Sequence, residues 1–189
     1  MDRSSAQGRS TTLRHETAAG IFAALPEIGE DLDARPEPGE PSTDFARRLL
    51  GTPAPEEGIT FAAQMFTRRA AVWWGHECLR HLAPLLDPGD PAMMRLAADW
   101  VARPDDETRT LALDGALAAP ARSPGVWLAL GAGWTGGSLA PPDSAVVAPP
   151  RFLTGRAVNA AVLSALARVP HRRRQETLGD FVSMALDLA

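Results

Sequence analysis

Apolar residues recur three and four positions apart along most of this chain, which is the spacing of an amphipathic helix. The first such group, residues 18–25, predicts a short helix that Pro26 ends. The longest group predicts a helix from about Thr60 to Ala83. Its apolar surface is so broad that neighbouring elements are expected on more than one side. The last predicted helix begins at about His171.

Five further helices share one start signal. A capping side chain, often next to proline, comes before the apolar positions, and acidic residues follow it in several cases. The cap accepts a backbone N–H, proline needs none at the first position, and acids stabilise the positive end of the helix dipole. These starts lie at Ser42 or Thr43, at Asp90–Pro91, at Pro104–Asp105, at Ser123–Pro124 and at Thr154. Together they predict an all-α fold.

We expect one compact multi-helix domain over residues 12–189. Residues 1–11 are polar and lack periodicity, which predicts a disordered tail. Residues 29–41 are acidic and proline-rich and predict a loop. Paired prolines predict an extended, proline-rich strap across the domain surface over residues 139–152. With 189 residues, 45% of them hydrophobic, the chain can bury roughly 70% of its unfolded surface.

Charge and composition exclude several classes of function. A net charge of -4 argues against a general nucleic-acid or anionic-membrane binder, because binding phosphate requires a basic face. All basic residues apart from histidine are arginines. The absence of lysine excludes Schiff-base chemistry, pyridoxal attachment and a Walker-type phosphate lysine.

The sequence also bears on location. Its single cysteine, Cys78, cannot form an internal disulfide, which fits a reducing compartment. The first fifteen residues lack the apolar stretch of a signal peptide, and the longest apolar run, residues 126–134, is about half a membrane span. We therefore expect a bacterial cytoplasmic protein without membrane insertion. Export without a leader peptide stays open.

A glycine-rich motif occupies residues 131–137. Gly131, Gly133 and Gly136 match the G-x-G-x-x-G pattern of dinucleotide-binding folds, but a helix start precedes them and prolines follow them. The motif is more typical of a helix C-terminus, with Gly136 or Gly137 as a left-handed cap. An anion-binding nest of exposed amides in residues 135–138 is an alternative.

The histidines and the cysteine give no recognisable metal or catalytic motif. His76 and His81 are five positions apart, which places them roughly 140° apart around a helix. Cys78 is expected in mid-helix, whereas catalytic cysteines favour helix N-termini. His15 and His171 are expected at the surface. We therefore expect no metal, no cofactor and no catalytic residue.

All five tryptophans lie between Trp73 and Trp134. Trp73 and Trp74 are adjacent and point about 100° apart on a helix, whereas Trp127 and Trp134 share a face. Two interpretations remain. The tryptophans form a core between three helices, or they line a recognition groove for a partner, since tryptophan dominates interface hot spots.

Residues 66–165 resemble an uncharacterised bacterial family that is often encoded beside type VI secretion genes. The resemblance is carried by WVARP at residues 100–104, by WLALGAGWTGGSLAP at residues 127–141, by Pro149–Pro150, and by LTGRAV at residues 153–158. It implies neighbours such as spike-tip proteins and effector adaptors. It implies no site residues.

The leading hypothesis is a non-enzymatic accessory or adaptor protein that binds a protein partner, a secretion-system component or an effector. Candidate partner-binding residues are Trp74, Trp127, Trp134, Gly136, Gly137, Ser138 and Arg109. One alternative is an enzyme or small-molecule binder that uses the 131–138 loop, with Arg109, Asp114, Thr135 and Ser138 as candidates. Another is a self-assembling structural subunit. The oligomeric state stays open.

Overall fold

The computed structural model describes residues 12–140 and 143–189. The predicted tail over residues 1–11 and the proline pair Pro141–Pro142 lie outside these described residues. The described part contains ten α-helices and one short 3-10 helix, with only two isolated β-bridges. The all-α prediction is therefore confirmed.

The helices differ widely in length, from four residues in α2 to eighteen in α10. They are α1 Ala18–Ala24, α2 Ile28–Asp31, α3 Ser42–Leu49, α4 Glu57–Met65, α5 Arg68–His81, α6 Asp90–Ala102, α7 Asp106–Ala118, α8 Pro124–Gly133, α9 Leu153–Leu166 and α10 His171–Leu188, with the 3-10 helix η1 at Ala83–Leu85. Helix α2 falls at the start of the segment expected to be a loop.

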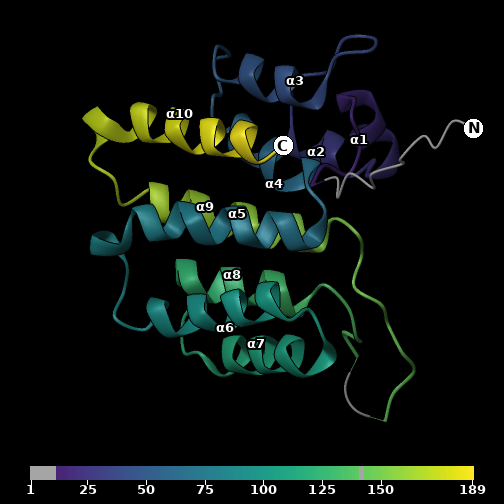
Figure 1. Ribbon diagram of the computed structural model, residues 1–189, viewed down its shortest axis with the longest axis vertical. Helices are drawn as coiled ribbons and strands as arrows, with labels where there is room; N and C mark the ends of the chain where they lie inside the picture. Colours follow the sequence, from purple (N-terminus) through teal and green to yellow (C-terminus); the bar gives the residue numbers. More distant parts are fainter. Residues whose placement is uncertain (1–11, 141–142) are drawn as a thin grey trace, which may run out of the picture.

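Two central helices, α8 and α9, connect the two ends of the molecule. Helix α9 packs against α4, α5 and α8, and α8 packs against α6, α7 and α9. Figure 1 shows α7 at one end of the molecule, followed by α6 and α8, then α5 and α9, then α10, with α3 at the far end. The segment between α8 and α9 forms a long connection at one edge.

The glycines of the G-x-G-x-x-G pattern serve helix packing. A Cβ on Gly133 would lie 2.7 Å from the Cβ of Leu113 in α7, and one on Gly131 would lie 3.2 Å from Val158 Cγ2 in α9. Both residues lie in α8, which ends at Gly133. The motif therefore lets α8 approach two neighbours closely. A helix precedes it, rather than the strand that a dinucleotide-binding fold requires.

The predicted helix from Thr60 to Ala83 is wrong in one respect, because it is broken into α4 and α5. Phe66 is extended, with φ -86° and ψ 158°, and forms an antiparallel bridge with Leu13. The Arg14 amide donates to the Met65 carbonyl at 2.7 Å, and the Thr67 amide donates to the Thr12 carbonyl at 2.8 Å. Pairing with residues 12–14, which are distant in sequence, overrides local helix propensity here.

All five predicted starts fall within one residue of a helix start, but not every predicted capping side chain acts as a cap. Asp105 is a cap in the expected sense, because its side chain accepts the Thr108 amide at 2.9 Å. Ser123 instead donates its hydroxyl to Asp90. The start predicted at Thr154 lies one residue late, because α9 begins at Leu153 and Thr154 lies inside its first turn.

Asp90 ties the start of α6 to the start of α8. It is fully buried, and its Oδ1 accepts the Gly125 amide at 2.8 Å and the Ser123 hydroxyl. Its Oδ2 accepts the Asp87 amide at 2.9 Å. A Cβ on Gly125 would lie 2.7 Å from the Asp90 carbonyl oxygen, so only glycine fits beside this carboxylate.

Replacing Asp90 with alanine should lower the free energy of unfolding by about 3 kcal/mol, because it leaves three donors, one of them the buried Gly125 amide, without their acceptor. Urea unfolding followed by tryptophan fluorescence measures this change. Asp114→Ala is the control, because Asp114 is exposed on α7. Equal stability of the two variants would contradict the structural role of Asp90.

Candidate functional site

Arg109 on α7 clamps the turn that follows α8. Its Nη1 donates to the carbonyls of Gly133 and Gly136, both at 3.4 Å, and its Nε donates to Asp106 at 2.9 Å. Gly137 has φ +74°, and a Cβ there would lie 2.6 Å from Arg109 Nη1. Glycine is therefore required at position 137 by backbone conformation and by space.

Ser138 closes the loop that follows this turn. Its hydroxyl oxygen accepts the backbone N–H of Ala140 at 3.0 Å and that of Val147 at 3.1 Å. The Leu139 amide donates to the Val147 carbonyl at 2.8 Å. These bonds join residues 138–140 to residues 143–147, and we call these two described parts together the closed loop. Residues 143–148 are all exposed, so this part of the predicted strap projects from the molecule.

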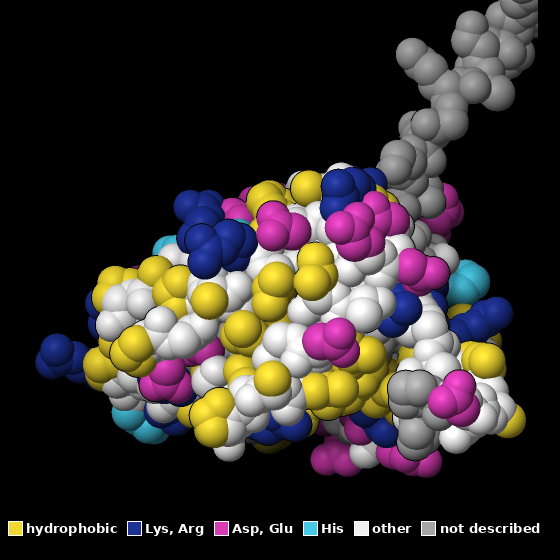
Figure 2. All heavy atoms as spheres, turned by 90° about the horizontal axis from the view of Figure 1, so that it is seen from below, with side chains coloured by type: hydrophobic (Ala, Val, Ile, Leu, Met, Phe, Trp, Pro, Cys, Tyr) yellow, Lys and Arg dark blue, Asp and Glu magenta, His cyan; other side chains and the backbone are white. Residues whose placement is uncertain are grey.

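A groove of about 650 Å³ runs between α7 and the closed loop. Its lining is mostly apolar and consists of Leu113, Leu117, Trp134, Ser138, Leu139, Ala140, Asp143, Ser144 and Val146. Three of these residues are large hydrophobics that remain strongly exposed: Leu117 at 55%, Leu139 at 44% and Val146 at 79%. Figure 2 views the molecule from the α7 end and shows hydrophobic side chains gathered on this face.

The structure brings together most of the predicted partner-binding residues at this α7–loop groove. Trp134 and Ser138 line the groove, and Arg109, Gly136 and Gly137 build the turn behind it. Trp134 is half-buried against a small core cluster formed by Ala116, Val126, Ala129 and Leu130.

Two predicted candidates lie elsewhere. Trp74 is 1% exposed, and its indole N–H donates to the Phe181 carbonyl at 3.0 Å inside the core. Trp127 is half-buried and packs against both core clusters. The sequence reasoning missed Leu113, Leu117, Leu139 and Val146. The four-residue spacing of the two leucines on α7 was the available signal.

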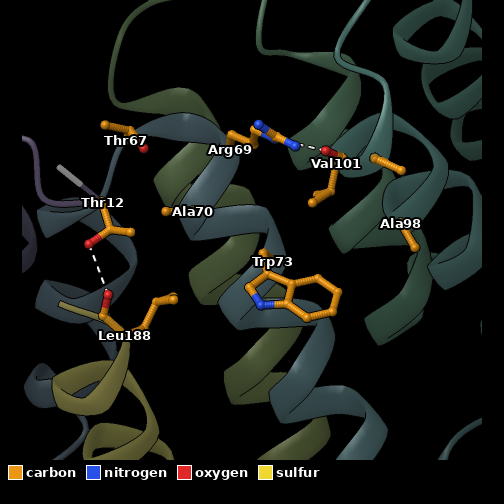
Figure 3. Close-up of a pocket in the computed structure, with 9 residues that line it drawn as sticks. Thr12, Thr67, Arg69, Ala70, Trp73, Ala98, Val101 and Leu188 are labelled. Atoms are coloured by element: carbon orange, nitrogen blue, oxygen red, sulfur yellow. Dashed lines mark hydrogen bonds between the residues drawn. The ribbon is translucent and has the colours of Figure 1, made fainter. Parts of the chain in front are cut away.

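A second apolar groove, of about 420 Å³, surrounds Trp73. Figure 3 shows the Trp73 ring between Ala70 of α5, Ala98 and Val101 of α6, and Leu188 near the C-terminus. Trp73 is 39% exposed, and its ring stacks on His76 at a centroid distance of 5.5 Å. The two grooves share no lining residue, so they are separate surfaces.

The residues expected for a small-molecule site do not converge on a closed pocket. The Thr135 hydroxyl donates to the Ala132 carbonyl at 2.7 Å and completes the end of α8. Asp114 is exposed on α7 and is not among the groove residues. Only Ser138 of this set lines the groove, so the geometry supports surface binding more than chemistry on an enclosed substrate.

Cys78 is fully buried in α5, and burial raises the pKa of its thiol well above the ordinary value. His76 contacts the Glu77 carboxylate, with Nδ1 at 3.0 Å from Oε1. The His81 ring meets the Phe181 ring edge to face, at a centroid distance of 5.9 Å. Across residues 12–140 and 143–189, no three His, Cys, Asp or Glu side chains are grouped to hold a metal ion.

These features define an all-α protein whose most developed candidate site is an exposed apolar groove beside a glycine turn. The sequence model of a family of unknown function, DUF6931, matches residues 45–189, and the chain belongs to this family. No curated protein and no solved structure was found to match the chain. Within the described residues, no helix is long and apolar enough to cross a membrane.

The Cys78 thiol should react slowly with Ellman's reagent in the folded protein and quickly after denaturation, because burial withholds the thiolate. Absorbance of the released thionitrobenzoate at mildly alkaline pH measures both rates. Fast reaction of the folded protein would show that Cys78 is accessible, contrary to its buried position in α5.

Replacing Gly137 with alanine should loosen the turn, because the new Cβ meets Arg109 and a positive φ strains any L side chain. Limited proteolysis followed by mass spectrometry should show faster cleavage between residues 134 and 148. Gly179→Ala is the control, since a Cβ there has no neighbour within 4 Å. Unchanged cleavage in Gly137→Ala would contradict the clamp by Arg109.

Proposed function

We propose that this protein is a non-enzymatic accessory protein that binds a partner protein through the α7–loop groove. The observation that carries the proposal is the closed loop, which holds Leu139 and Val146 in water beside Leu117 of α7. Exposing contiguous apolar side chains is unfavourable, and such patches mark interaction sites. The Ser138 hydroxyl accepts the amides of Ala140 and Val147 and so holds the loop before binding, which lowers the entropy lost on association.

The charges around the groove favour one kind of partner segment. Asp143 lines the groove, and the exposed Asp114 lies on the same helix as Leu113 and Leu117. None of the described arginines or histidines lines the groove. An apolar segment with flanking basic residues would bury its apolar side chains here and place its positive charges near these carboxylates. We therefore propose such a segment, carried by another protein, as the occupant.

The partner belongs, in this proposal, to a type VI-like secretion system, as a spike-tip component or an effector. Support comes from the order of motifs between residues 100 and 158, which resembles a family encoded beside such genes. In that setting the protein would act as an adaptor and hold its partner without chemical change.

Changing Leu117 or Val146 to aspartate should weaken partner capture at least about tenfold, a loss of about 1.4 kcal/mol, because a charge would enter an apolar contact. Tagged protein is used to capture partners from the native bacterium, with quantitative mass spectrometry as readout. Leu85→Asp is the matched control, because Leu85 is an exposed leucine outside the groove, at 38% exposure.

Three other outcomes would contradict the proposal. Loss of capture in Trp73→Ala but not in Leu117→Asp would move binding to the Trp73 groove. Loss in Leu85→Asp as well would indicate nonspecific adhesion. If the captured species is a second copy of the chain, and sedimentation shows concentration-dependent assembly that Leu117→Asp abolishes, the groove serves a self-assembling subunit instead.

A further inference from the structure

Three arginines gather at the α4–α5 junction without an acidic partner among the described residues. Seven of the described arginines form salt bridges, and Arg14, Arg68 and Arg151 are among the others, which form none with any described residue. The chain has 23 acidic and 19 basic residues, so it contains enough carboxylates to pair with every arginine. Like charges repel, and their close grouping therefore calls for a physical reason.

The break between α4 and α5 creates this grouping. Residues 12–14 pair with residues 65–67, and Arg14 Nε donates to the Gln64 carbonyl at 3.4 Å. Gln64 Nε2 donates to the Phe152 carbonyl at 3.1 Å, which holds the chain next to Arg151 at the same junction. Arg68 is the first residue of α5, and its Nη1 donates to the Thr135 carbonyl at 2.7 Å.

The positive ends of two helix dipoles meet the same arginines. Helices α5 and α9 have fourteen residues each, and neither has an acidic residue in its first turn or a side-chain cap. Arg68 opens α5, and Arg151 lies two residues before α9. A cation beside a helix N-terminus is unfavourable. The two uncapped N-termini and the arginines beside them would all favour a bound anion. Arg69, the neighbour of Arg68, is turned away and donates to the Val101 carbonyl, as Figure 3 shows.

Burial adds to the cost of this arrangement. It lowers the pKa of the Arg14 guanidinium, and the positive charges of Arg68 and Arg151 lower the same pKa further. The pKa of Arg68 is lowered by burial and then by Arg151. Among the described residues, no carboxylate opposes this shift for either group. A bound anion would restore the missing counter-charge.

Two buried polar side chains at the same junction are incompletely satisfied. Gln64 and Thr154 are each 1% exposed, and Gln64 Oε1 and Thr154 Oγ1 accept and donate no hydrogen bond within the described residues. Thr154 belongs to the first turn of α9, and a Cβ on Gly155 would collide with the Gln64 side-chain amide. Buried polar atoms without partners are uncommon, and a bound water or ion is one way in which proteins satisfy them.

We propose that Arg14, Arg68 and Arg151 form a binding site for a phosphoryl group, supplied as inorganic phosphate or as a small phosphomonoester. A guanidinium group can donate two parallel hydrogen bonds to phosphate oxygens. Three guanidinium groups therefore suit a multiply charged phosphate better than they suit a singly charged carboxylate. The site is independent of the α7–loop groove and of the partner proposed there.

Phosphate should raise the melting temperature of the protein more than chloride or acetate does at equal ionic strength, because it binds only the folded state. Isothermal titration calorimetry with inorganic phosphate gives the affinity directly. In Arg151→Gln the phosphate effect should fall at least about tenfold. Arg151 is exposed, so this variant should fold normally. Arg172→Gln on α10, another exposed arginine, is the matched control and should bind as the unchanged protein does.

Competition separates the two sources of the phosphoryl group. Glycerol phosphate that displaces phosphate at a lower concentration would indicate a phosphomonoester ligand, and weaker displacement would indicate free phosphate. Equal stabilisation by phosphate, chloride and acetate would overturn the proposal. So would equal phosphate binding by Arg151→Gln and Arg172→Gln. In the absence of phosphate, Arg151→Gln should melt no lower than the unchanged protein, because it removes a repulsion.

Discussion

The pairing of residues 12–14 with residues 65–67 is the constraint on which much of the structure depends. It ends α4 at Met65 and lets α5 begin in a new direction at Arg68. The same segment reaches the end of α10, because the Thr12 hydroxyl donates to the Leu188 carbonyl at 2.9 Å. One short extended segment therefore holds the α4–α5 junction against the C-terminal helix. It also places Arg14 beside Arg68, at a cost in charge repulsion that a ligand would offset.

The sequence predicts the helices well where local chemistry decides their limits. Periodic apolar residues and proline or aspartate starts place α6, α7 and α8 within about one residue. The sequence prediction fails at Phe66. The helical pattern continues there, but residues 12–14 supply other hydrogen bonds. Threonine favours the capping position and predicts a cap at Thr154, yet Thr154 lies buried inside α9. Both outcomes depend on contacts with segments distant in the sequence, which the local pattern of residues does not reveal.

The candidate site was predictable only in part, for a related reason. The glycine turn and Ser138 stand out in the sequence because their residue types restrict backbone and hydrogen bonding. The five tryptophans were a weaker guide, since Trp74 and Trp100 are buried and Trp73 lines another groove. The groove itself is made by leucines and valines, which resemble core residues in any sequence. Only the placement of α7 beside the closed loop leaves Leu117 and Val146 exposed.

The central claim is that the closed loop is fixed before any partner binds. Amide hydrogen exchange of the isolated protein, resolved by residue, tests it most directly. The Leu139 amide donates to the Val147 carbonyl, and the Val147 amide donates to the Ser138 hydroxyl. The Val146 amide has no acceptor within the described residues. The account predicts slow exchange at Leu139 and Val147 beside fast exchange at Val146. Exchange at the rate of an unstructured peptide at all three amides would contradict it.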